Sequence, residues 1–104
     1  MKRQKFSLEL IEEHLSFWEM AKAVWLRSDV KEDDDFATCV CKLYVRHGRV
    51  DDVYDELKAH GRIKPNTPKT IIRDTIMDGH LEDKELQTIA RYVFQFNKKY
   101  VPFN

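Results

Sequence analysis

The closest approach to a catalytic set in this sequence is the run Glu12, Glu13 and His14, where two carboxylates adjoin an imidazole. Carboxylates and imidazoles are the usual groups of general acid-base catalysis. Neighbouring residues on a helix point in different directions, however, and the surrounding apolar pattern places Glu12 and Glu13 on the solvent-facing side. The sequence also lacks a glycine-rich phosphate loop, a nucleophile elbow and a His-Glu-x-x-His zinc motif. We therefore expect a protein that is not an enzyme.

Two cysteines and four histidines are the residues that could bind a transition metal. Cys39 and Cys41 are two residues apart in a predicted helix, so their side chains point to different faces. The histidines are His14, His47, His60 and His80. They lie in separate segments, without the spacing of a zinc site. We expect two buried or partly buried reduced thiols, no metal and no cofactor.

The segment 28–35 is rich in aspartate and resembles a cation-binding loop at first sight. It lacks the glycine and the terminal glutamate that an EF-hand loop requires at fixed positions. We interpret its acids as N-capping groups that also compensate the dipole of the helix that follows.

Length and composition indicate one small domain. The chain has 104 residues, of which 42% are hydrophobic and 12% aromatic, with only three glycines and three prolines. This composition disfavours disorder and a turn-rich β fold. No apolar run has the length of a membrane span, and the start Met1–Lys5 lacks the apolar stretch of a signal peptide. We expect a single domain over residues 1–104, with no membrane association and a cytoplasmic location.

Apolar residues recur at helical spacing along most of the chain, which predicts an all-α fold of about five helices. The expected ranges are 8–27, 34–47, 51–60, 68–78 and 83–97. Gly48, Gly61 and Gly79 each follow a helical segment and predict its end. Asp51 or Asp52 is expected to cap the third helix. Thr67 followed by Pro68 predicts the start of the fourth helix.

Charge is distributed unevenly although the net charge is zero. Residues 7–37 contain nine acids and three bases, a local charge of −6, whereas residues 38–73 contain eight bases and four acids, or +4. A neutral chain is a poor general binder of polyanions, but its basic middle could form a local patch that faces phosphates. The alternative is that these charges only solvate helix faces.

The three short helical segments within residues 36–79 resemble a helix-turn-helix DNA-binding unit. The resemblance starts at Leu43–Leu57, where a helix ends in a tyrosine and a glycine and a short helix with apolar spacing follows. It implies that residues 68–78 form the recognition helix. The implied DNA-binding residues are Lys64, Asn66, Thr67, Lys69, Thr70 and Arg73. On this hypothesis Lys69 and Arg73 are exposed while Ile72 and Ile76 are buried.

Two features depart from the helix-turn-helix pattern. The link between Ala59 and Thr67 is about twice as long as the usual tight turn. Asp74 lies on the expected reading face, where its carboxylate would repel phosphates. Despite these departures, the leading hypothesis is a small regulatory protein that binds double-stranded DNA through a helix-turn-helix-like unit. The departures leave a second hypothesis open.

The second hypothesis is a helical adaptor or inhibitor that binds another protein and no nucleic acid. Its acidic N-terminal third could steer the chain toward a basic partner. Aromatic residues, which are favoured interface anchors, are concentrated near both ends of the chain. The expected anchors are Phe17, Trp18, Trp25, Tyr100 and Phe103. Both hypotheses are compatible with a homodimer formed through helix 8–27.

Overall fold

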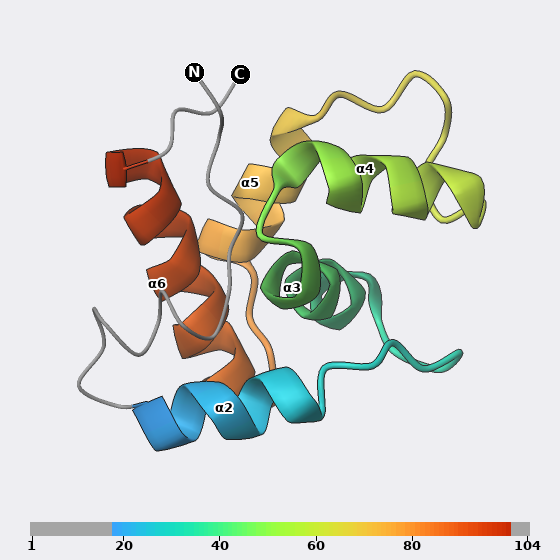
Figure 1. Ribbon diagram of the computed structural model, residues 1–104. Helices are drawn as coiled ribbons and strands as arrows, with labels where there is room; N and C mark the ends of the chain where they lie inside the picture. The colour runs from blue at the N-terminus through green and yellow to red at the C-terminus, as the bar shows by residue number, and fades with distance from the viewer. Residues whose placement is uncertain (1–17, 101–104) are drawn as a thin grey trace.

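Helix α3 is the centre of the fold, since it packs against each of the other four described helices. The computed structural model describes the backbone of residues 18–100 and the side chains of residues 19–96. The helices are α2 (Trp18–Leu26), α3 (Phe36–His47), α4 (Val50–Ala59), α5 (Thr70–Asp78) and α6 (Lys84–Tyr100). Figure 1 shows α3 almost end-on, with α2 below it, α4 above it and α6 to its left. The described residues contain helices and no strand, which confirms the predicted all-α fold.

Side chains on nearly every side of α3 are buried. Cys39, Val40, Cys41, Tyr44 and Val45 are each no more than 1% exposed. Between residues 38 and 46, only a narrow polar stripe of Thr38, Lys42 and Arg46 is not buried in this way, and a helix with apolar residues around most of its circumference is typical of the interior of a fold. The two cysteines point to different faces and are both free and buried, as predicted. Their burial on opposite sides follows from the central position of α3.

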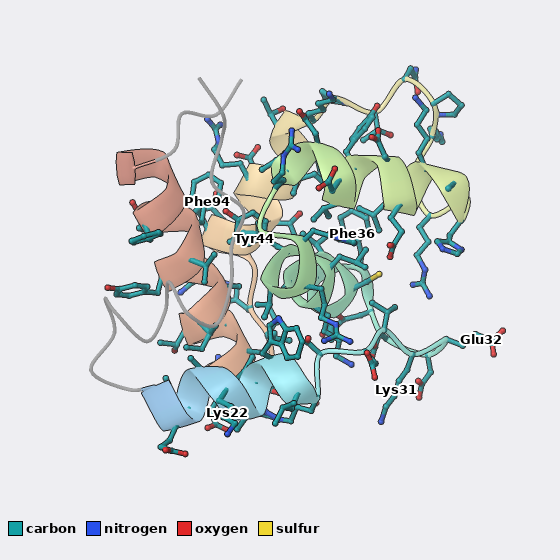
Figure 2. All side chains as sticks on the ribbon, in the orientation of Figure 1. Lys22, Lys31, Glu32, Phe36, Tyr44 and Phe94 are labelled. Carbon is teal, nitrogen blue, oxygen red and sulfur yellow. The ribbon has the colours of Figure 1, made fainter. Side chains whose placement is uncertain are left out.

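The surrounding helices close the core with their apolar faces. Ile72 and Ile76 of α5 and Ile89 of α6 are fully buried. The rings of Tyr44 in α3 and Phe94 in α6 lie 5.9 Å apart at an angle of 48° (Figure 2). Because α4 has only 10 residues and α5 only 9, both are shorter than the roughly 12–15 residues that an isolated helix needs. Packing against α3 and α6 is therefore what stabilises them.

The start and end of α3 are fixed by two local contacts. The Asp35 carboxylate accepts a hydrogen bond of 2.8 Å from the Thr38 amide, so α3 begins at Phe36 rather than at residue 34. At the other end Gly48 has φ of +70°, and its amide donates to the Tyr44 carbonyl over 2.7 Å. A left-handed residue at this position is most easily a glycine. The acidic cap and the glycine stop were both predicted from the sequence.

The predicted cap of α4 is wrong. This helix spans Val50–Ala59, one residue ahead of the predicted 51–60, and Arg49 precedes it without a side-chain capping bond. Asp51 and Asp52 lie inside the first turn, where their charges favour the positive end of the helix dipole. Only two residues, Gly48 and Arg49, connect α3 to α4, so α4 begins almost directly after α3 ends. Gly61, with φ of +69°, follows its end as expected.

The predicted start of α5 is also wrong, because the helix begins at Thr70 rather than at Pro68. The Thr67 amide donates to the Lys64 carbonyl over 3.0 Å, and the Thr67 carbonyl accepts the Tyr54 hydroxyl over 2.5 Å. These two bonds hold Thr67 in the turn that closes the link from α4, so it does not cap the helix.

The outer helices differ from prediction in their described ends. Helix α2 ends at Leu26, one residue before the predicted limit of 27, and residues 8–17 of the predicted first helix lie outside the described residues. Helix α6 begins at Lys84 and continues to Tyr100, three residues beyond the predicted end at 97. The Asp83 carboxylate accepts a bond of 3.1 Å from the Leu86 amide at its start. Within the described residues, no helix is long and apolar enough to cross a membrane.

Candidate functional site

The outer face of α5 has the exposure that the sequence predicted. Lys69, Thr70 and Arg73 are exposed, whereas Ile72 and Ile76 are fully buried. The side chain of Lys69 is 52% exposed and that of Arg73 is 57% exposed. The sequence pattern therefore placed the apolar and polar sides of this helix correctly.

Both cations on this face are already paired with carboxylates. Lys69 Nζ lies 3.0 Å from Asp51 Oδ1 of α4, and Arg73 Nη2 lies 3.1 Å from Asp74 Oδ1. The hydrogen bond to Asp51 raises the pKa of Lys69, so this ammonium is charged at neutral pH. Each pair is exposed and weak, but each also places a negative charge beside the cation that would meet a phosphate.

The remaining predicted DNA contacts lie on the link before α5. Lys64 and Asn66 are exposed and Thr67 is half-buried. Two amides at the start of α5 are already used, since Ile71 donates to the Pro68 carbonyl over 3.2 Å and Ile72 donates to the Lys69 carbonyl over 3.0 Å. This helix end therefore presents fewer donors to a phosphate than an open N-terminus would.

The basic middle of the sequence is partly neutralised by the acidic loop that precedes α3. Lys42 Nζ lies 2.8 Å from Asp34 Oδ2, and Arg46 Nη2 lies 2.7 Å from Asp29 Oδ1. Partial burial alone would raise the pKa of Asp34, but the bonds from Lys42 and from the Lys31 amide hold it below its usual value. The uneven charge along the chain therefore does not become an equally uneven charge on the surface.

Of the predicted protein-interface aromatics, Trp25 is the one whose side chain is described. It is half-buried, and the Arg46 guanidinium carbon lies 4.5 Å from a ring centroid of Trp25. Trp25 thus takes part in an internal cation-π contact. The neighbouring Leu26 is 60% exposed. The predicted anchors Phe17, Trp18, Tyr100 and Phe103 lie outside the described residues or have no described side chain, and the predicted homodimer through helix 8–27 stays a prediction.

A shallow hollow with an acidic rim lies between the start of α3 and the end of α5. Its volume is about 530 Å³. We call it the acidic hollow, and it is lined by Asp35, Phe36, Ala37, Asp74, Thr75, Asp78 and Gly79. The three aspartates are exposed, while Phe36 and Ala37 are half-buried. No lysine or arginine is among the described residues that line it, although Arg73 pairs with Asp74 at its edge.

Helix α6 holds in place the part of the acidic hollow that the end of α5 forms. The Gly79 carbonyl accepts hydrogen bonds from Gln87 and from Arg91, the latter over 2.9 Å. Arg91 also donates to the Ile76 carbonyl over 3.3 Å. A guanidinium at the carbonyl end of a helix is electrostatically favourable. The end of α5, and with it Asp78, is therefore fixed relative to the core.

A second cavity, the interhelical pocket, lies between the loop 28–35, α3 and the end of α4. Its volume is about 520 Å³. Cys39, Leu43 and Leu57 form a buried apolar floor. The rim carries both signs of charge and consists of Lys31, Glu32, Glu56, His60 and Arg62. Lys31 and Glu32 are exposed on the loop, away from the helices (Figure 2).

The sequence predicted the α5 face but not these two hollows. Asp74 was noted in the sequence only as an obstacle to DNA binding. The sequence signal for the acidic hollow was that Asp74, Asp78 and Gly79 lie close together near the end of one predicted helix. Nothing in the sequence indicated that the start of α3 packs beside the end of that helix. The cavities depend on contacts between distant segments.

Comparisons of this chain with models of protein families, with curated proteins and with solved structures found no match.

Proposed function

We propose that this chain is a non-enzymatic helical interaction module, and that the acidic hollow binds a basic segment of a partner protein. The observation that carries the proposal is the composition of the hollow, which three exposed aspartates, Phe36 and Ala37 line without a lysine or arginine, although Asp74 is paired with Arg73 at its edge. This function belongs to the adaptor or inhibitor class of the second sequence hypothesis, but Asp74 and Asp78 come from α5 and not from the acidic N-terminal third on which that hypothesis rested.

The acidic hollow offers a carboxylate and an apolar surface, and each favours a different kind of side chain on the partner. Asp78 has no ion-pair partner among the described residues, so its carboxylate can accept a lysine or arginine without breaking an internal pair. Phe36 offers half-buried apolar surface to one side chain of the partner. The expected ligand is thus a short segment in which basic residues flank an apolar residue.

Electrostatics favour this proposal over DNA binding. Asp51 and Asp74 lie within 3.1 Å of the two cations on α5, so a phosphate would compete with carboxylates already in place. Asp74 and Asp78 on the same helix would repel the DNA backbone. Phosphate contacts supply most of the affinity in nonspecific DNA binding, and this surface offers few cations without a carboxylate beside them.

The test is a fluorescence-anisotropy titration with a labelled peptide that alternates lysine and leucine, beside the same peptide with glutamate in place of lysine. Asp74→Asn with Asp78→Asn removes two negative charges from the hollow and should weaken binding of the basic peptide by about tenfold. The matched control is Asp33→Asn with Glu82→Gln, which removes two exposed charges elsewhere and should change affinity less than about twofold.

Two results would contradict the proposal. One is equal affinity for the lysine and glutamate peptides, and the other is equal loss of affinity in the hollow variant and its control. Amide spectra of each variant establish that it is folded. Since the substituted residues are exposed, we expect little change in stability.

DNA binding is the second candidate, because Lys69 and Arg73 are both more than half exposed on the outer face of α5. It is tested by titrating mixed duplex DNA at low and moderate salt with the wild-type chain and with Lys69→Gln combined with Arg73→Gln. Salt-sensitive binding that this variant loses would favour the helix-turn-helix function. An absence of binding at low salt would exclude it.

A further inference from the structure

We propose that the partner of the acidic hollow is a second copy of this chain, which binds through residues 58–64. We call these residues the basic segment; they comprise the end of α4 and the start of its connection to α5. This inference rests on the proposed function and makes it specific by naming the partner. The contact is head-to-tail, because the hollow of one copy binds the basic segment of the next. It therefore differs from the predicted homodimer, which uses helix 8–27 of both copies.

The basic segment carries cations that no carboxylate neutralises. Residues 57–73 contain five lysines and arginines and no aspartate or glutamate. Three of the five, Lys58, Arg62 and Lys64, belong to the basic segment. Among the described residues none of these three forms an ion pair. Lys58 and Lys64 are also exposed. A carboxylate from another chain can therefore approach them without breaking an internal pair.

The sequence of the basic segment has the pattern expected of a ligand for the hollow. Ile63 lies between Arg62 and Lys64, so two basic residues flank an apolar one. The side chain of Ile63 is half-buried, as is the aromatic side chain in the hollow. Arg62 is partly used within its own chain, since it donates to the Asp34 backbone carbonyl over 3.4 Å. Lys58 and Lys64 therefore supply the charge for the contact, and Ile63 supplies its apolar part.

Backbone hydrogen bonds fix the shape of the basic segment. The Arg62 amide donates to the Leu57 carbonyl over 2.9 Å, and the Gly61 amide donates to the Lys58 carbonyl over 3.1 Å. An ordered segment loses less conformational entropy on binding than a flexible one. The connection from α4 to α5 runs along the edge of the molecule, outside α4 (Figure 1). No residue of the basic segment lines the hollow of its own chain, so the segment is available to another copy.

The hollow supplies the opposite charge on an equally fixed surface. Asp78 is exposed and has no ion-pair partner among the described residues. Arg91 holds the end of α5, because it donates to the Gly79 carbonyl over 2.9 Å. The net charge of the chain is zero, so overall repulsion does not oppose association of two copies. Because the hollow and the basic segment share no residue, one copy can use both at once, and the contact can repeat from copy to copy.

Sedimentation velocity of the whole chain tests for self-association. We expect the average mass to rise above one chain between about 10 μM and about 1 mM at low salt. At high concentration the mass should exceed two chains, because a head-to-tail contact does not stop at a dimer unless a ring closes. In about 0.5 M salt the mass should fall toward that of one chain, since salt screens contacts between exposed charges.

Two variants test which surfaces meet. Asp74→Asn with Asp78→Asn alters the hollow, and Lys58→Gln with Lys64→Gln alters the basic segment. Each variant alone should associate about tenfold more weakly than wild type. A mixture of the two should regain association but stop at two chains, because one intact hollow then meets one intact basic segment.

The matched control is Lys22→Gln with Lys84→Gln, which removes two exposed lysines elsewhere. It should associate like wild type within about twofold. Amide spectra of each variant show whether it is folded.

Three results would overturn the inference. They are a mass of one chain at every concentration, a mixture that associates no better than either variant alone, and association of both variants as strong as that of wild type. The last result would indicate another interface, such as helix 8–27.

The lysine–leucine peptide distinguishes failure of this inference from failure of the proposed function. A chain that stays monomeric but binds the peptide at the hollow loses only the second copy as partner. A chain that neither self-associates nor binds the peptide loses both.

Discussion

Lys42 Nζ lies 2.8 Å from Asp34 Oδ2, and both side chains are nearly buried, with 12% and 13% of their surface exposed. Lys42 also donates to the Asp29 backbone carbonyl over 3.2 Å. One side chain of α3 thus fixes both ends of the acidic loop. Together with the Arg46–Asp29 pair, it holds the loop beside α3, where the loop forms a wall of the interhelical pocket.

Lys42→Met should lower the free energy of unfolding by about 1.5–3 kcal/mol, because the Asp34 carboxylate loses a charged hydrogen-bond donor in a poorly solvated position. Urea denaturation at pH 7 measures the change. Lys22→Met, on the exposed side of α2, is the control and should change stability by less than about 0.5 kcal/mol. A loss of similar size in both variants would show that the ion pair contributes nothing specific.

Acid should destabilise the protein partly through the cap of α3. Hydrogen bonds from Thr38 hold the pKa of the Asp35 carboxyl below its usual value. A carboxyl with a lowered pKa stabilises the folded state above its unfolded pKa and loses that contribution as pH falls through the folded value. Below about pH 4, wild type should therefore lose more stability than Asp35→Asn does.

Urea midpoints of both chains at pH 7 and pH 3 test the Asp35 prediction. Asparagine is also a good N-cap, so the two chains should differ little at pH 7. Parallel decreases in the two midpoints would contradict the role given to the Asp35 carboxylate. Asp35→Ala should cost about 1 kcal/mol at pH 7 because it removes the cap itself.

The cysteines of α3 should resist alkylation in the folded protein. Burial raises the pKa of Cys41 to about 12, which lowers its thiolate fraction by about a thousandfold relative to an ordinary thiol. Iodoacetamide at pH 8, followed by intact-mass analysis, should show little modification without denaturant and two adducts with it. Of the two, Cys39 should react first, because it lines a pocket. Rapid modification of Cys41 under native conditions would contradict the central position of α3.

Tyr54→Phe should lower the free energy of unfolding by about 0.5–1.5 kcal/mol, because the hydroxyl donates to the Thr67 carbonyl over 2.5 Å. This bond is the tether between α4 and the link to α5. Amide exchange should therefore accelerate at residues 64–69 more than in α6. Uniform acceleration along the chain would indicate a general loss of stability instead.

Local signals in the sequence predicted most of the fold. The apolar spacing gave the helix type of each described segment, Gly48 gave the end of α3, and the buried side of α5 was predicted at Ile72 and Ile76. These features depend on residues that are near in sequence. Helix starts were less predictable, because the Tyr54 hydroxyl binds Thr67 from 13 residues away and overrides its capping tendency.

The candidate sites could not be predicted in the same way. The charge of residues 38–73 was counted correctly from the sequence. The sequence did not show, however, that Lys42 and Arg46 of this segment pair with Asp34 and Asp29 of the preceding loop. Phe36 and Asp78, which line one hollow, are more than 40 positions apart in the sequence. A single sequence does not specify which distant segments meet.

The contacts of α3 with every other described helix also determine how the domain can open. No pair of neighbouring helices can separate from α3 without admitting water to the shared core. The amides of α3 should accordingly exchange with deuterium only through global unfolding, while the ends of α4 and α5 exchange through local fraying. The same arrangement restricts sequence variation: the buried positions of α3 must fit several neighbours at once, so compensating substitutions there would have to arise on more than one helix.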